Sequence, residues 1–252
     1  MIQRPAIERD LRTLGLRPGA HVEVHSSLSS MGYIAGGAAT VVDALMHTVE
    51  PTGALAMSNY PVSPPLPVSP AERANGIAWK IRRLADDSDQ RTGTGAISDE
   101  FRRRPGVVCG AGIHRICAWG ANAQTYATGY QHLVDNAGLV LLIGVDIDRC
   151  SSMHLADSTP ISAEARQKMD SQWGPSQVPI IADIVQRQYP ADIILGAEET
   201  NHRRDPWAHT RQEADSRNLI KRGKIGAASC MLFKAQDLLD LLVAVRRSGP
   251  FG

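Results

Sequence analysis

Gly138-Leu139-Val140-Leu141-Leu142-Ile143-Gly144-Val145-Asp146 is the stretch that decides the fold class of this 252-residue chain. It has the length and composition of a strand that is buried on both faces. A second stretch follows it, Cys150-Ser151-Ser152-Met153-His154-Leu155-Ala156-Asp157, with serines suited to an N-cap and apolar residues at helical spacing. The sequence therefore predicts a core strand that leads into a helix, and open α/β sheets bind their ligands at that edge.

His154 and Asp157 stand three residues apart, so a helix would place both side chains on one face. A histidine beside a carboxylate can act as a general base near neutral pH. A surface ion pair without chemistry fits the same spacing, so the pair alone leaves both interpretations open. Cys150 precedes the same helix, whose N-terminus can lower a thiol pKa and produce a nucleophile, but a free cysteine usually packs as a small apolar group.

Strands and helices alternate along the rest of the chain. We expect strands over 22–25, 54–57, 139–145 and 224–232, and helices over 5–14, 40–48, 95–104, 121–128, 179–188 and 235–246. Thr40 is the expected N-cap of the second helix. The alternation favours a layered α/β fold, and because no linker divides the sequence, we expect a single domain over residues 1–252.

Composition excludes several classes of function. The chain has 27 Lys and Arg against 26 Asp and Glu, so its charge gives no sign of a nucleic-acid surface. No apolar run is long enough for a membrane span, and the N-terminus lacks a signal-peptide core. The widely spaced Cys109, Cys117, Cys150 and Cys230 predict reduced thiols and a cytoplasmic protein. The histidine spacing matches no zinc motif, so we expect no metal.

A Ser/Gly-rich loop follows the first expected strand. It reads His25-Ser26-Ser27-Leu28-Ser29-Ser30-Met31-Gly32 and continues to Gly36-Gly37, ahead of a helix. Free backbone N–H groups at a helix N-terminus suit a phosphate. The loop matches neither the P-loop nor the Rossmann fingerprint, and a purely structural loop fits equally well.

Taken together, these segments resemble the aminoglycoside 3-N-acetyltransferases, which use acetyl-coenzyme A. The resemblance runs in order along nearly the whole chain, through the loop over 25–37, Gly53 to Met57, Gly95 to Val107, His114, Ala118-Trp119-Gly120, Leu141 to Val145, His154-Leu155-Ala156-Asp157 and Gly223-Lys224-Ile225-Gly226. It implies a three-layer α/β/α sandwich around a mixed central sheet. It also implies an acyltransferase that binds acetyl-coenzyme A and a small-molecule amine, needs no metal, nucleic acid or membrane, and leaves a homodimer open as its assembly.

The resemblance assigns roles to particular residues. His154 is the expected catalytic base of a direct acetyl transfer, with Asp157 as its acidic partner and His25 near the thioester. Asp157 stands where the family has the longer glutamate. The expected contacts with the cofactor are Ser26, Ser27, Leu28, Ser29, Met31, Gly32, Ile97 and Phe101. The expected contacts with the substrate are Asn59, Tyr60, His114 and Asp157.

Two departures keep the acceptor amine open. The chain reads Met57-Ser58-Asn59 where aminoglycoside-modifying members commonly have Met-Pro-Thr, and it has Gly110-Ala111-Gly112-Ile113 where they commonly have a His-Pro pair. The expected acceptor is the 3-amino group of a 2-deoxystreptamine aminoglycoside. The alternatives are another amine, such as an amino-phosphonate or amino sugar, and a non-catalytic coenzyme A-binding protein. A Ser or Cys hydrolase ranks last because G-x-S-x-G does not occur.

Two groups of charged residues have more than one interpretation. Arg102-Arg103-Arg104 can complement a helix end or contact the phosphates of the cofactor. The acidic stretches over 86–89 and 198–199 can be solvated surface or can bind a polycationic acceptor.

Overall fold

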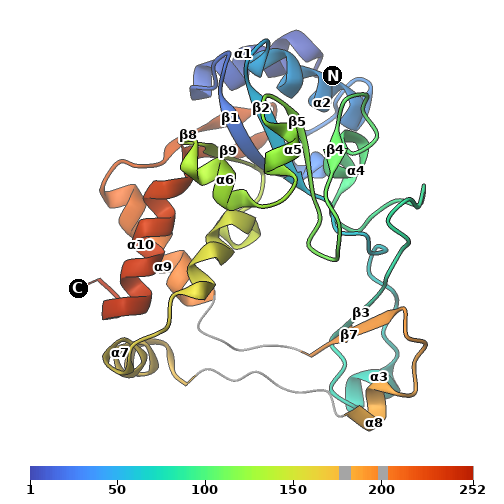
Figure 1. The fold of residues 1–252 in the computed structure, drawn as a ribbon, viewed down its shortest axis with the longest axis vertical. Coiled ribbons are helices and arrows are strands. Elements are labelled where there is room, and N and C mark those ends of the chain that lie inside the picture. The colour runs from blue at the N-terminus through green and yellow to red at the C-terminus, as the bar shows by residue number, and fades with distance from the viewer. Residues whose placement is uncertain (176–182, 198–203, 252) are drawn as a thin grey trace.

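The computed structural model describes residues 1–175, 183–197 and 204–251. Its centre is a mixed sheet of seven strands in the order β4-β5-β2-β1-β6-β9-β8 (Figure 1). These strands are β1 (His21–Ser26), β2 (Ala54–Ser58), β4 (Val108–Cys109), β5 (Ile116–Gly120), β6 (Leu139–Ile143), β8 (Lys221–Ile225) and β9 (Ala228–Lys234). β1 runs parallel to β2 and β6, and the outer pairings are antiparallel. The expected apolar run is thus the central strand β6.

Alternating side chains of the central strands feed two separate cores. In β6, Leu141 and Ile143 pack on one face of the sheet, while Val140 and Leu142 pack on the other. The first face is covered by α1 (Arg4–Leu14), α2 (Gly37–Val49) and α4 (Ala96–Phe101). The second is covered by α5 (Ala123–Tyr126), α6 (Tyr130–Asp135), α9 (Arg204–Ser216), α10 (Ala235–Ser248) and the 3-10 helix η3 (Ser151–Ser158). The expected three-layer α/β/α fold with a mixed sheet is confirmed.

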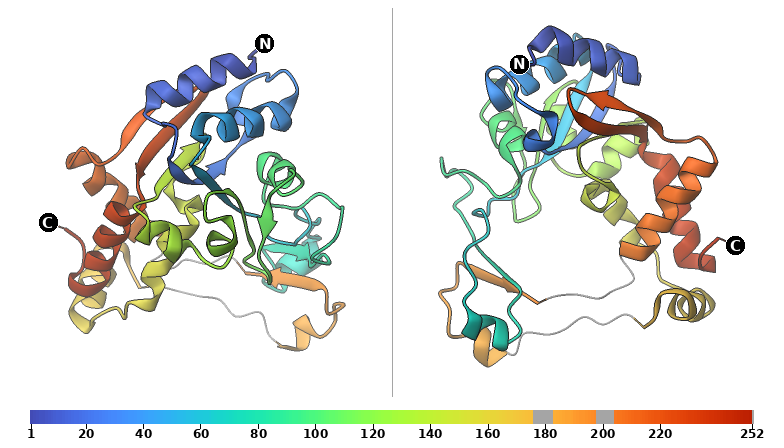
Figure 2. Two further views of the ribbon diagram at one scale, coloured as in Figure 1. Left: turned by 45° about the horizontal axis from the view of Figure 1, so that its top comes forward. Right: turned by 180° about the vertical axis from the view of Figure 1, so that it is seen from behind.

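A small two-stranded sheet lies apart from this sandwich (Figure 2). β3 (Trp79–Arg82) pairs antiparallel with β7 (Ile193–Gly196), with α3 (Pro70–Ala74) and α8 (Asp183–Gln186) beside them. The remaining elements are α7 (Ala163–Trp173) and the 3-10 helices η1 (Leu28–Met31) and η2 (Ile147–Arg149). Within the described part of the chain, no helix is long and apolar enough to cross a membrane.

Several local expectations need correction. Thr40 lies inside α2, because Gly36 takes the left-handed backbone conformation (φ 76°) that starts the helix earlier. The strand expected over 224–232 is the hairpin β8–β9, with Gly226 (φ 61°) in its turn. The helix expected over 179–188 falls partly outside the described residues. The elements not expected were β4, β5, β7, α3, α6, α7 and α9.

The four cysteines are not all reduced in this structure. Cys109 and Cys117 face each other across the β4–β5 pair and form a disulfide, whereas Cys150 and Cys230 are buried free thiols. The prediction of four thiols is therefore wrong for the first pair. Their separation in sequence hid an antiparallel register that brings them side by side.

Candidate active site

η3 lines up three of its side chains toward one cavity. A 3-10 helix has three residues per turn, so Ser151, His154 and Asp157 fall in one row. All three line a cavity of about 740 Å³, here called the His154 cavity. Its other lining residues are Ser58, Tyr60, His114, Ile116, Thr128, Gly129 and Tyr130. The tighter helix thus gathers residues whose spacing in sequence had suggested a shared α-helical face.

His154 and Asp157 form a hydrogen-bonded pair. His154 Nδ1 lies 2.9 Å from Asp157 Oδ2, and Arg246 Nη1 donates to the other carboxylate oxygen at 3.2 Å. The buried Trp207 packs edge-on against the imidazole, with ring centroids 4.8 Å apart. Asp157 and Trp207 therefore fix the orientation of the ring, and a proton on Nδ1 leaves the Nε2 lone pair for chemistry.

A second histidine–carboxylate pair lies beneath the first site, and the sequence analysis missed its carboxylate. Glu23 is fully buried on β1, and its Oε1 lies 2.6 Å from His25 Nε2. The same oxygen accepts the backbone N–H of Ser152 at 3.0 Å. Glu23 Oε2 is buried without a hydrogen-bond partner. The signal available in the sequence was the position of Glu23, a charged residue between two valines of an expected strand, where a buried charge needs a partner.

His25 Nε2 lies between a buried carboxylate and a backbone N–H group. His25 Nε2 faces both the Glu23 carboxylate and, at 3.2 Å, the Ser151 N–H, and one ring nitrogen cannot donate and accept together. The shorter of the two contacts is the one to the buried Glu23 carboxylate. His25 therefore sits next to Ser151 of the His154 cavity and directly precedes Ser26 in the chain.

Hydroxyl groups form a chain along the wall of the His154 cavity. Ser58 Oγ lies 2.9 Å from Tyr130 Oη and 2.8 Å from Ser151 Oγ, and Tyr60 Oη lies 3.4 Å from Ser151 Oγ. Burial and the nearby Glu23 charge raise the pKa of Tyr130 well above its ordinary value, so it stays a neutral phenol. Tyr60 also packs edge-to-face on His114. Of the expected substrate residues, Tyr60, His114 and Asp157 meet here.

Cys150 does not have the properties of a nucleophile. Its side chain is buried, and burial together with the Glu23 charge raises its thiol pKa well above the ordinary value. The thiol therefore remains protonated and packs as a small apolar group. Of the two interpretations of Cys150, the packed apolar group is the one that the structure supports, because desolvation dominates at this position.

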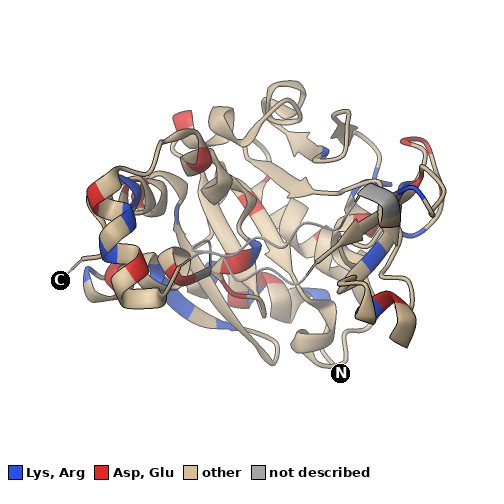
Figure 3. Cartoon of the chain, turned by 90° about the horizontal axis from the view of Figure 1, so that it is seen from below, with Lys and Arg blue, Asp and Glu red and all other residues tan. Residues whose placement is uncertain are grey.

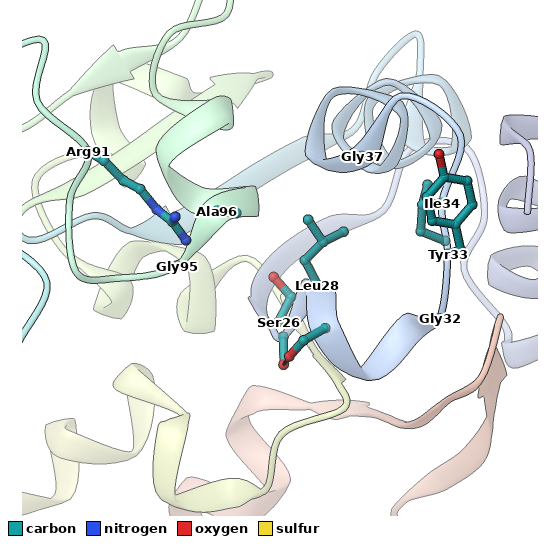
Figure 4. Close-up of a pocket in the computed structure, with 11 residues that line it drawn as sticks. Ser26, Leu28, Gly32, Tyr33, Ile34, Gly37, Arg91, Gly95 and Ala96 are labelled. Atoms are coloured by element: carbon teal, nitrogen blue, oxygen red, sulfur yellow. Dashed lines mark hydrogen bonds between the residues drawn. The ribbon is translucent and has the colours of Figure 1, made fainter.

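A second cavity of about 500 Å³ lies along the serine-rich loop, and we call it the Ser26 cavity (Figure 4). Five expected cofactor residues line it, namely Ser26, Ser27, Leu28, Ser29 and Gly32. Tyr33, Ile34, Gly37, Arg91, Gly95 and Ala96 complete the wall. Among the described residues of this lining, Arg91 is the one that carries a charge. Hydroxyls, glycines and a cation suit an anionic ligand.

Four expected contact residues lie in the protein interior instead. Met31, Ile97 and Phe101 are core residues packed under α2 and β1, with side chains at most 1% exposed. Asn59 is fully buried, its Oδ1 accepts from Arg115 Nη2 at 2.8 Å, and its Nδ2 faces the hydroxyls of Thr92, Thr94 and Ser98. None of the four lines either cavity. Gly32, Ala96 and Tyr60, which are sequence neighbours of Met31, Ile97 and Asn59, do line the cavities.

Charge is interspersed over the molecule (Figure 3). The acidic stretch over 86–89 lines neither the His154 nor the Ser26 cavity, and residues 198–199 lie outside the described residues. The arginine run contacts protein atoms: Arg102 and Arg103 bind Asp99, while Arg104 binds Asp43 and Glu100. Over the described ranges, no three His, Cys, Asp or Glu side chains gather in a way that could hold a metal ion.

Comparison with known proteins agrees with this architecture. Residues 24–246 match the family model described as aminoglycoside 3-N-acetyltransferase. The SPbeta prophage-derived aminoglycoside N(3')-acetyltransferase-like protein YokD of Bacillus subtilis is 27% identical over 94% of this chain and 89% of its own length. Aminoglycoside N(3)-acetyltransferase VII of Streptomyces paromomycinus is 26% identical over 100% and 96%. The crystal structure of aminoglycoside acetyltransferase AAC(3)-Xa superposes with a TM-score of 0.68, at 25% identity, over 97% of this chain and 92% of that chain.

The chain is thus an α/β/α sandwich with a histidine–carboxylate pair in the wall of one cavity and a serine-rich loop along another. Because the family model spans most of the sequence, the chain belongs to the aminoglycoside 3-N-acetyltransferase family. It is an acetyltransferase, as the sequence analysis expected.

Proposed function

We propose that the protein transfers an acetyl group directly from acetyl-coenzyme A to an amine, namely the 3-amino group of a 2-deoxystreptamine aminoglycoside, with His154 as the general base. The observation that carries this proposal is the pair at 2.9 Å between His154 Nδ1 and Asp157 Oδ2 in the wall of a 740 Å³ cavity. The relatives named above support the acetyl-transfer chemistry, and another structural neighbour is described as AAC-IIIb in a binary complex with CoASH.

The two cavities divide the substrates. The Ser26 cavity, with its hydroxyls, glycines and single arginine, receives acetyl-coenzyme A, and the His154 cavity receives the amine. His25 lies at their boundary because it precedes Ser26 and contacts Ser151. Holding both reactants at one boundary supplies the proximity that direct transfer needs.

His154 removes the proton that the attacking amine must lose. As the nitrogen forms its bond to the acetyl carbonyl carbon, Nε2 accepts that proton, and the carbon–sulfur bond breaks to release coenzyme A as its thiol after protonation. Asp157, held by Arg246, keeps the proton on Nδ1 and stabilises the imidazolium that forms. The hydroxyls of Ser151 and Tyr60 and the boundary residue His25 are the groups available to meet charge on the carbonyl oxygen.

The second candidate is the same chemistry on a less cationic amine, and one observation favours it. Among the ten described residues that line the His154 cavity, Asp157 is the single carboxylate, and it is already bound to His154 and Arg246. A polycationic aminoglycoside is attracted by clustered carboxylates. An amine with fewer charges, such as an amino sugar, fits the hydroxyl-rich wall better.

The test is release of free thiol from acetyl-coenzyme A in the presence of aminoglycosides, amino sugars and simple amines. We expect His154→Ala to lower kcat by about 10²- to 10⁴-fold while coenzyme A affinity stays within a few fold. His47→Ala is the control, because His47 is an exposed histidine of α2 that lines neither cavity. Undiminished turnover in His154→Ala would rule out this base. Turnover only with amines other than aminoglycosides would select the second candidate.

A further inference from the structure

Arg91 is a cation at a cavity, and no residue that the structure describes pairs with its side chain. It lies in the wall of the Ser26 cavity opposite the loop that carries Ser26 and Leu28, and its side chain extends toward Gly95 and Ala96 (Figure 4). It has neither an ion pair nor a hydrogen bond with any described residue. The neighbouring arginines 102, 103 and 104 are all bound to carboxylates. With respect to the described part of the chain, the Arg91 guanidinium is therefore available to bind a ligand.

The backbone on both sides of Arg91 is firmly held. Arg102 Nη2 donates to the carbonyl of Gln90 at 2.9 Å, and Arg103 Nη2 donates to the carbonyl of Asp89 at 2.7 Å. On the other side, the buried Thr92 donates its N–H to Asp99 Oδ1 at 3.1 Å. These bonds fix the start of the Arg91 side chain at the cavity without using its guanidinium.

Asp99 is the centre of this arrangement. Its carboxylate binds Arg102 Nε at 2.9 Å, Arg103 Nη2 at 3.2 Å and the Thr92 backbone. Burial alone would raise the pKa of Asp99, but the hydrogen bonds from Arg102 and Thr92 and the charges of Arg102 and Arg103 hold it below the ordinary value. Asp99 is thus a charged anchor that ties two arginines and the Arg91 segment together.

We propose that Arg91 binds a phosphate group of the coenzyme A donor and that Asp99, Arg102 and Arg103 position it for that contact. The inference rests on the proposed use of acetyl-coenzyme A in the Ser26 cavity. Coenzyme A carries a diphosphate and a 3′-phosphate, and a guanidinium binds such groups through paired, charge-assisted hydrogen bonds. Arg102 and Arg103, for which the sequence suggested phosphate contact, act indirectly: they hold the segment that carries Arg91, and Arg91 makes the contact.

The experiment measures equilibrium binding of coenzyme A, dephospho-coenzyme A and pantetheine by titration calorimetry, without an acceptor. For Arg91→Ala we expect about tenfold weaker binding of coenzyme A and unchanged binding of pantetheine. Arg91→Lys keeps the charge but loses the paired geometry, so its loss is smaller. Arg83→Ala is the matched control, because it removes an exposed arginine of the same region that lines neither cavity.

Each outcome decides a separate question. If Arg91→Ala weakens binding of coenzyme A but not of dephospho-coenzyme A, Arg91 contacts the 3′-phosphate. If it weakens binding of both, Arg91 contacts the diphosphate. Unchanged coenzyme A binding in Arg91→Ala overturns the inference, as does an equal loss with pantetheine, which has no phosphate. If the unaltered protein fails to bind coenzyme A at all, the proposed function fails instead.

The positioning role has its own readout. Asp99→Asn is expected to weaken coenzyme A binding when Arg91 is present. In the Arg91→Ala background it should have no further effect, because both substitutions remove the same contact between Arg91 and the phosphate. Additive losses in the double variant would show that Asp99 acts on the fold in general and not through Arg91.

Discussion

Substituting Asn59 by alanine is expected to destabilise the protein without changing which amine it uses. The side chain is fully buried, and its Oδ1 accepts a 2.8 Å hydrogen bond from the Arg115 guanidinium. Burial already lowers the pKa of Arg115, and leaving one of its N–H groups unpaired costs about 1.5–3 kcal/mol. The two amide hydrogens of Asn59 serve three hydroxyls at 3.1–3.3 Å, and losing them adds about 1–2 kcal/mol. The free energy of unfolding should fall by about 2.5–5 kcal/mol, the sum of these ranges.

Urea unfolding followed by circular dichroism measures this loss, and the denaturant slope should stay constant if the change is in stability alone. Asn59→Asp is the matched variant: it keeps the acceptor for Arg115 and loses the amide donors, so about 1–2 kcal/mol should be lost. An Asn59→Ala protein with unchanged stability and an altered KM for the amine would refute this reasoning. It would return Asn59 to the substrate site that the sequence suggested.

Two further substitutions test buried carboxylates. Glu23→Gln keeps an acceptor for the Ser152 N–H but removes the charge facing His25, so kcat should fall about tenfold. The double variant with His25→Asn should be no slower than His25→Asn alone. Additive losses of kcat would contradict a role of Glu23 through His25. Because the pKa of Asp99 is lower in the folded than in the unfolded protein, its contribution to stability is present above the unfolded pKa and disappears as the pH falls through the folded one. Asp99→Asn should therefore lower the Tm at pH 7, and the difference in Tm from the unaltered protein should become smaller as the pH falls. Thermal unfolding at a series of pH values measures this difference. A difference in Tm that stays constant with pH would count against the linkage.

The sequence by itself determined the elements that depend on local pattern. The apolar run over 138–146 predicted the central strand β6, because a strand buried on both faces needs apolar side chains at every position. The row from Ser151 to Asp157 and the serine-rich loop from His25 to Gly32 were recognised from residue order, and the structure places them beside two cavities. Order along the chain is sufficient where neighbouring residues share one element.

Only the tertiary structure decided which side chains meet. Glu23 and Ser152 are 129 residues apart, and Cys109 pairs with Cys117 through a strand register that the sequence did not reveal. Asn59 is next to two cavity residues in the sequence, but its side chain points into the core. Arg91 lies at the Ser26 cavity because Asp99, Arg102 and Arg103 bind the backbone on both sides of it. The physical reason is that periodicity records which face of an element is apolar, whereas hydrogen bonding, burial and pKa depend on groups brought from distant parts of the chain.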